Sequence, residues 1–338
     1  MTHSANGIIR VGLVGFGRCG AVHAQAWRDC PGARLVGACD PDNVARRHAE
    51  RLGIPAFSGV EEMLESAQLD AVSVCTPPSS HGALAALCLR RGLHVLCEKP
   101  LTTDLASARH LWEAAADVDR RLVVSSKFRH IPELCVAREL VLSGEIGPGK
   151  NFRIEFAAVV PMADRWNSRR SISGGGVIMD NGWHAFDLVH FLFGGVQAVH
   201  ARLGGGPQGL EVEESASINI VAAGGETGQA VLSWSLPPRG DEYVSIHGER
   251  GSVHVGWKRS YLERRAAEAV VFGKAYDKAG AHRRMMAAFR EVVAGRQEPW
   301  ISWDEILGIA AAVEAAYRSL ASQSEETVGG PLRSAAVE

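Results

Sequence analysis

The N-terminal part of the chain alternates short apolar runs with helical patterns, and this alternation constrains the fold more than any other feature. The apolar runs predict strands at residues 8–15, 34–40, 70–77, 94–100 and 121–128. Between them, the patterns predict helices at residues 18–29, 43–52, 80–91 and 104–118. Strands rich in Val, Leu and Cys without alternation are typically covered on both faces. The pattern therefore predicts a doubly wound, parallel α/β sheet.

The pattern changes after Lys127. Strands that alternate like a sheet with one exposed face, and a turn at "AGGETG", indicate an α+β domain with a largely antiparallel open sheet. We expect a first domain over residues 1–127, a second over 128–330 and a polar tail at 331–338. The helices predicted in the second part lie at 133–143, 180–193, 280–294 and 303–321, and the strands at 150–160, 197–203, 213–223, 228–236, 242–247 and 251–256.

Composition excludes several classes of protein. A net charge of −2 provides no global basic field for nucleic acid or an anionic membrane. No run reaches the roughly 20 apolar residues of a membrane helix, and "MTHSANGIIR" lacks the features of a secretory signal. The seven cysteines are odd in number and form no CxxC pair, so we expect reduced thiols, no metal site and a cytoplasmic protein. Those in apolar runs, Cys39, Cys75 and Cys97, are predicted to be small buried side chains.

The first strand runs into a glycine turn that is typical of dinucleotide binding. Its glycines have GxGxxG spacing, follow a strand and open a helix. Glycine allows a tight turn and lets a pyrophosphate approach backbone N–H groups at the positive end of a helix. The residues predicted to hold the cofactor here are Gly15, Phe16, Gly17, Arg18, Cys19 and Gly20.

The second strand ends at Asp40, where a dinucleotide fold places a carboxylate for the ribose hydroxyls. A carboxylate repels a 2′-phosphate, so NAD is favoured over NADP. Arg46 and Arg47 on the next helix could weaken this preference, although we interpret them as surface charges.

The third strand ends in "CTPPSSH" at the carboxyl edge of the sheet, where ligands of such folds bind. Thr76 and Pro77 are predicted to line the nicotinamide side. Ser79 or Ser80 could equally cap the following helix. His81 is included among the cofactor-binding residues, although a structural role is favoured over a catalytic one.

The fourth strand ends in Glu98, Lys99 and Pro100 at the same edge. A lysine there could bond a substrate hydroxyl and stabilise the alkoxide that develops as hydride leaves. Glu98 could orient Lys99 or tune its pKa. Pro100 restricts the backbone of Lys99 and could form a cis bond. From the triplet alone, a solvated strand end is an equally good interpretation.

The second half supplies a matching acid–base pattern in "SGGGVIMDNGWHAFDLVHFLFG". Asp180, His184 and Asp187 have the spacing of one stripe of an α-helix. A histidine one turn from a carboxylate, behind a glycine-rich opening, is an acid–base arrangement. The alternative is a capped helix with surface aspartates and a core histidine. Asp187 is interpreted as a supporting or capping residue.

These motifs together resemble the glucose-fructose oxidoreductase / inositol dehydrogenase (Gfo/Idh/MocA) family over nearly the whole chain. The resemblance includes the glycine turn with His23 after it, the acidic strand end, the TP…H segment, EKP, and "GGGVIMDNGWHAFD". "KFRHIP", "HGERGSV" and "SWDEILGIAAAVEAAYRSL" are similar too. It implies that Lys99 binds the reacting hydroxyl, Asp180 holds a substrate hydroxyl, and His184 takes the hydroxyl proton while hydride passes to nicotinamide. It also implies a homodimer or homotetramer.

Substrate contacts are predicted at several positions. Trp166 could stack on a sugar or cyclitol and Asn167 could bond its hydroxyls. Trp183 departs from the smaller residues common beside the family's histidine and could reshape the pocket. Lys127 and Arg129 are weaker candidates, and the arginines at 165, 169 and 170 could meet an anion or form an exposed basic loop.

The sequence thus predicts an NAD-dependent dehydrogenase acting on a secondary alcohol of a small polyhydroxylated substrate: a sugar, sugar derivative or cyclitol. Three alternatives stay open. They are a hydrolase or lyase that oxidises its sugar only transiently, a reductase using NADPH, and a non-catalytic NAD-binding sensor.

Overall fold

The computed structural model describes residues 7–116 and 118–329, which group into two compact units. The first unit contains the chain up to residue 102 together with 106–130 and 277–301. The second contains 103–105, 131–276 and the residues from 302 onward. The expected polar tail at 331–338 lies outside the described residues.

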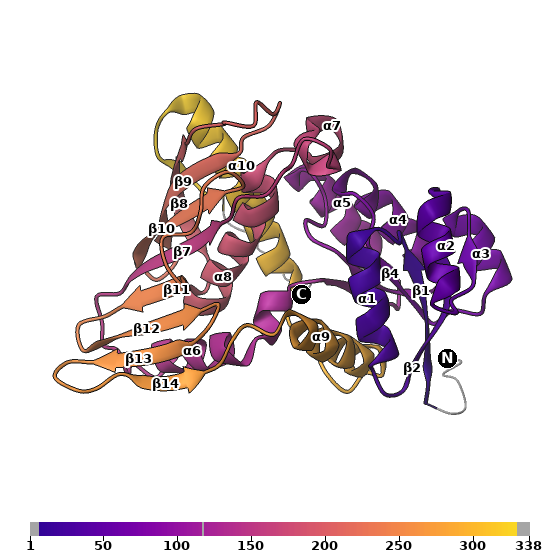
Figure 1. The fold of residues 1–338 in the computed structure, drawn as a ribbon, viewed down its shortest axis with the longest axis horizontal. Coiled ribbons are helices and arrows are strands. Elements are labelled where there is room, and N and C mark those ends of the chain that lie inside the picture. The colour runs from indigo at the N-terminus through magenta and orange to yellow at the C-terminus, as the bar shows by residue number, and fades with distance from the viewer. Residues whose placement is uncertain (1–6, 117, 330–338) are drawn as a thin grey trace, which may run out of the picture. The chain divides into compact units, whose positions relative to one another are not determined.

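The first unit is built on a six-stranded, wholly parallel sheet whose described strands have the order β3-β2-β1-β4-β5-β6. This confirms the predicted doubly wound sheet. Strand order reverses between β1 and β4, which is where such sheets bind ligands. The strands are β1 (Ile9–Val14), β2 (Ala33–Cys39), β3 (Ala56–Phe57), β4 (Ala71–Val74), β5 (His94–Cys97) and β6 (Leu122–Val124). The helices between them are α1 (Arg18–Arg28), α2 (Asn43–Arg51), α3 (Val60–Ser66), α4 (Pro78–Arg90) and α5 (Leu105–Ala116). The strands β1, β2 and β4 and the helices α1 to α5 are labelled in Figure 1.

Helix α9 (Lys278–Val293) also belongs to the first unit, although the sequence placed it in the second domain. It packs against α1 and against the 3-10 helix η1 (Lys127–His130). Trp27 of α1 meets Phe289 of α9 edge to face, with ring centroids 6.1 Å apart. Burial of apolar side chains against α1 therefore holds α9 in the first unit, although α9 lies far from α1 in the sequence.

The second unit contains a nine-stranded mixed sheet, and among its described strands only β7 and β10 pair in parallel. This confirms a largely antiparallel sheet, and β9 and β10 form the hairpin predicted at "AGGETG". The strands are β7 (Asn151–Ala157), β8 (Val196–Leu203), β9 (Ser215–Ala222), β10 (Thr227–Ser233), β11 (Glu242–His247), β12 (Gly251–Gly256), β13 (Ser260–Arg264), β14 (Val270–Gly273) and β15 (Glu326–Thr327). Its helices are α6 (Pro132–Leu142), the short α7 (Arg170–Ser173), α8 (Trp183–Phe193) and α10 (Trp303–Ser322).

The segment predicted as one α-helix over 180–193 begins differently. Residues Ile178–Gly182 form a π-helical turn, and the α-helix starts only at Trp183. A π turn holds more residues per turn than an α turn, so Asp180 does not share the simple α-helical stripe predicted for it. Glu213 stabilises this opening, because its Oε1 accepts hydrogen bonds from the backbone N–H groups of Gly176 and Ile178.

The helices were also compared with the length and hydropathy that a membrane span requires. Within the described ranges, no helix is long and apolar enough to cross a bilayer.

Candidate active site

The glycine turn after β1 has the shape that the GxGxxG spacing predicts. Gly15 has φ +89°, and a Cβ there would lie 2.9 Å from the backbone of Cys75. A Cβ on Gly20 would lie 2.1 Å from the Gly15 carbonyl oxygen, so both positions require glycine. Gly17 differs, because its Cβ would meet only open space. The turn therefore leaves bare backbone at the N-terminus of α1, which fits a pyrophosphate.

Asp40 lies directly after β2 and is bonded to this turn. One carboxylate oxygen accepts the Phe16 N–H at 2.7 Å and the other accepts the Asp42 N–H at 2.8 Å. Each oxygen keeps a further acceptor site, so the carboxylate can still bond ribose hydroxyls. Arg46 donates to the carbonyl oxygens of Asp40 and Pro41, and is thus half-buried rather than a freely solvated charge.

The segment after β4 is held by side chains of its own. Ser80 donates to the Thr76 hydroxyl at 2.7 Å. The two ring nitrogens of the buried His81 lie 2.6 Å from the Thr76 carbonyl oxygen and 2.7 Å from that of Pro100. Both nitrogens are thereby engaged with backbone, so His81 ties the Thr76–Pro77 segment to the EKP turn.

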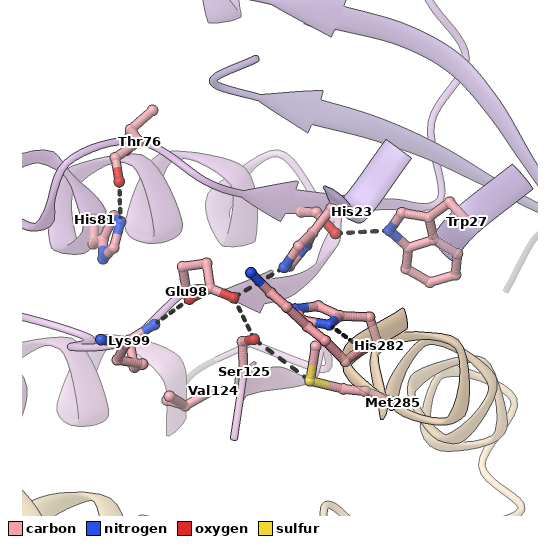
Figure 2. A network of polar contacts seen from close by, with 12 residues as sticks. His23, Trp27, Thr76, His81, Glu98, Lys99, Val124, Ser125, His282 and Met285 are labelled. Atoms are coloured by element: carbon pink, nitrogen blue, oxygen red, sulfur yellow. Dashed lines mark hydrogen bonds and ion pairs between the residues drawn. The ribbon is translucent and has the colours of Figure 1, made fainter. Parts of the chain in front are cut away.

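Glu98 is the centre of a polar network at the carboxyl edge of the sheet (Figure 2). Its Oε1 lies 2.9 Å from Nε2 of the buried His23 and accepts a hydrogen bond from Ser125. Burial alone would raise the pKa of Glu98, but His23 and Ser125 together hold that pKa well below its usual range. Glu98 is therefore an anion whose charge is balanced inside the unit, and its Oε2 accepts the backbone N–H of Lys99 at 3.3 Å.

Lys99 follows Glu98 and is joined to Pro100 by a cis peptide bond, one of the geometries that a proline at this position allows. Its side chain is partly exposed. Burial lowers the pKa of Lys127, the nearby positive charges of Lys99 and Lys278 act in the same direction, and together these effects bring it to about 8. Several cationic groups thus gather at this edge, where they favour a substrate oxygen that becomes negative.

In the second unit, Asp180 is partly exposed on the π turn and His184 is 7% exposed on α8. Phe156 packs against the His184 ring, with centroids 6.1 Å apart. Asp187 is fully buried, which contradicts the alternative of a surface aspartate. Trp183 is 2% exposed, so its indole is part of the packed interior of this unit.

The weaker substrate candidates fall in different environments. Trp166 is 38% exposed in the 3-10 helix η2 (Trp166–Ser168), and Asn167 beside it is half-buried. Arg129 is buried and donates to the Trp300 carbonyl oxygen at 2.9 Å, which is a structural contact inside the first unit.

Three residues of the Glu98 network were not predicted from the sequence. Ser125 follows β6 at the same sheet edge and could have been found by the strand-end rule that selected Asp40 and Lys99. His282 and Met285 come from α9: the His282 ring lies 5.7 Å from that of His23, and Met285 Sδ lies 3.4 Å from Ser125 Oγ. No local sequence signal assigns α9 to this site.

Comparisons with known proteins agree with this fold. Residues 9–126 match the oxidoreductase family with an NAD-binding Rossmann fold, and residues 136–254 match the GFO/IDH/MocA C-terminal domain. An inositol 2-dehydrogenase of Rubrobacter xylanophilus is 31% identical over 73% of this chain and 71% of its own length. One from Rhizobium meliloti is 26% identical over 95% of this chain and 99% of its own. The WlbA dehydrogenase of Bordetella pertussis, solved with NADH and UDP-GlcNAcA, is 25% identical, with a TM-score of 0.83 over 95% of this chain and 98% of that one.

A dinucleotide-binding domain followed by this C-terminal domain defines an NAD-dependent dehydrogenase. The chain belongs to the GFO/IDH/MocA family.

Proposed function

We propose that the chain oxidises a secondary alcohol of a sugar, sugar derivative or cyclitol with NAD. The observation that carries this proposal is the Glu98 network, which fixes Lys99 at the sheet edge beside a glycine turn suited to a dinucleotide. Two relatives named inositol 2-dehydrogenase and one solved with UDP-GlcNAcA support a polyhydroxylated substrate.

In the proposed chemistry, three side chains bind the substrate, and two of them act on the reacting hydroxyl. Lys99 would bond the hydroxyl oxygen and stabilise its developing negative charge. His184 would accept the hydroxyl proton, and Asp180 would hold a second substrate hydroxyl. Bound NAD supplies a nicotinamide ring that accepts the hydride.

NAD is the proposed cofactor because of Asp40. Its carboxylate is bonded to the glycine turn, so it cannot easily withdraw from a 2′-phosphate. Arg46 donates to the Asp40 carbonyl oxygen through Nη1, and the rest of its guanidinium could favour NADP. Measuring both affinities on the same preparation tests this preference.

A homodimer or homotetramer is proposed as well. Exposed Val270 and Val271 on the edge strand β14 are apolar surface of the kind that a second copy could cover. Light scattering coupled to size exclusion tests the assembly, and a monomer at working concentrations contradicts it.

The function is tested by incubating the protein with NAD or NADP and a panel of cyclitols, sugars and sugar nucleotides. Net formation of reduced nicotinamide supports the dehydrogenase. A changed sugar without net reduced nicotinamide indicates transient oxidation instead. Tight NAD binding with no turnover on any compound indicates a sensor.

A further inference from the structure

Cys19 occupies an unusual place for a cysteine. It is the second residue of α1, inside the glycine turn, and it is partly exposed, whereas Cys75 at the end of β4 is buried. The ligand atoms of Cys19, His23 and Cys75 all lie within 4.8 Å of one another. Two thiols and an imidazole therefore meet where the dinucleotide pyrophosphate is expected.

His23 links this cluster to Glu98. The ring is fully buried, and its Nε2 is engaged with Glu98 at 2.9 Å. Its Nδ1 is also buried, and the Cys19 thiol lies beside the ring. His23 lies one helical turn after Cys19, so the side chains share a face of α1. The result is a thiol–imidazole–carboxylate series, the arrangement that activates a cysteine nucleophile.

The charges around Cys19 favour the thiolate. The hydrogen bond with Cys75 lowers the pKa of Cys19 and, together with His23, outweighs the opposing effects of burial and Glu98. Burial would lower the pKa of His23, but Cys19 and Glu98 raise it, so the imidazole carries a positive charge beside the sulfur. The N-terminus of α1 adds a partial positive charge.

We propose that Cys19 is an oxidation site, at which a hydroperoxide converts the thiolate to a sulfenic acid and Cys75 resolves it to a Cys19–Cys75 disulfide. A nucleophilic, partly exposed thiol with a second thiol beside it is the arrangement found in redox-sensing cysteines. The site is independent of the proposed alcohol chemistry, and only its competition with NAD rests on the proposed function.

The two steps balance. With hydrogen peroxide as the hydroperoxide, the Cys19 thiolate attacks one peroxide oxygen, an S–O bond forms, the O–O bond breaks, and the departing hydroxide takes a proton to become water. Sulfur loses two electrons and the peroxide gains them. The Cys75 sulfur then attacks the Cys19 sulfur and the S–O bond breaks. The hydroxyl leaves with the Cys75 proton as a second water.

The disulfide would change the cofactor site directly. A Cβ on Gly20 would lie 3.8 Å from the Cys75 Cβ, so the first turn of α1 already packs on Cys75. A covalent bond there would alter the backbone N–H groups to which a pyrophosphate binds. Oxidation is therefore expected to weaken NAD binding, and bound NAD is expected to slow oxidation.

The test uses the full chain, freed of NAD and treated with a chelator so that a bound metal ion cannot protect the thiols. At pH 6 an ordinary thiol is only about 0.3% ionised, so Cys19 should react first with a stoichiometric amount of hydrogen peroxide. Peptide mapping without reduction should find the Cys19–Cys75 disulfide. Cys75→Ser should stop at a sulfenic acid on Cys19 that dimedone traps. Cys135→Ser, which removes the other partly exposed thiol, is the matched control and should leave the disulfide unchanged.

Two results overturn the proposal. One is oxidation of Cys135 before Cys19 in the wild-type chain. The other is a folded Cys19→Ser variant, with wild-type circular dichroism, that loses thiols at the wild-type rate. If NAD binds but leaves the oxidation rate unchanged, the expectation that bound NAD slows oxidation of Cys19 is wrong. Because none of these measurements needs turnover, failure of the proposed dehydrogenase activity does not affect them.

Discussion

Replacing Glu98 with glutamine removes one charge from the core of the network and keeps the shape of the side chain. The carboxylate accepts hydrogen bonds from His23 and Ser125. A hydrogen bond to a charged group contributes about 1.5–3 kcal/mol, against about 0.5–1.5 kcal/mol between neutral groups. The amide oxygen of glutamine still accepts, so the loss over two bonds is about 2 kcal/mol in the free energy of unfolding.

The loss should depend on pH, and its direction follows from the two pKa shifts. The folded pKa of Glu98 is lowered from 4.5, so its contribution is present above that value and is lost as pH falls through the folded pKa. The folded pKa of His23 is raised from 6.5 to about 10, so its contribution is complete below 6.5 and is lost as pH rises toward 10. The Glu98→Gln variant should therefore lose most stability between pH 4.5 and 6.5 and less at pH 9.

Urea unfolding followed by tryptophan fluorescence measures this loss, because Trp27 is buried in the first unit. The variant and the wild type are compared at about pH 6 and pH 9, on either side of the ordinary pKa of histidine. Glu65→Gln, which changes an exposed glutamate on α3, is the matched control and should show no such pH dependence. The ion pair between Glu98 and His23 would be refuted by an equal loss of unfolding free energy at both pH values, or by a loss below about 0.5 kcal/mol at the lower pH.

Three further predictions concern the site. Lys99→Ala should lower kcat by about 10²–10⁴-fold with NAD affinity nearly unchanged, and near-normal turnover would remove Lys99 from the chemistry. Asp40→Asn keeps a hydrogen-bond acceptor and removes the charge, so the ratio of NADP to NAD dissociation constants should fall; an unchanged ratio contradicts the role of Asp40. Gly176→Ala places a Cβ 2.1 Å from the backbone oxygen of Glu213 and should destabilise the protein by about 1–3 kcal/mol in a thermal melt. Gly205→Ala, where a Cβ meets nothing within 4 Å, is its control and should stay near wild type.

The first sheet could be predicted because its strands are continuous apolar runs and its helices have clear boundaries. Several of the elements that were missed lack those signals. Strand β3 has only two residues, α3 has seven, and β13 is half polar. The membership of α9 in the first unit could not be predicted either, because docking depends on which apolar surface a helix buries and not on its own pattern.

Part of the candidate site follows from a single rule. Residues that follow parallel strands meet at one edge, and this rule identified Asp40, Glu98 and Lys99. The π turn before α8 was not predicted, because a hydrophobic period of 3.6 does not reveal one extra residue in a turn. His23 was recognised only through the family resemblance, while its contacts with Glu98 and Cys19 depend on the packing of α1 against the sheet edge.

The central claim is that this chain transfers a hydride from a polyol to NAD. It is tested most directly by quantifying reduced nicotinamide and oxidised product together, with purified protein, NAD and the compound panel. The account predicts that the two form in equal amounts with at least one cyclitol or sugar derivative. Saturable NAD binding without reduced nicotinamide on any member of the panel would contradict it.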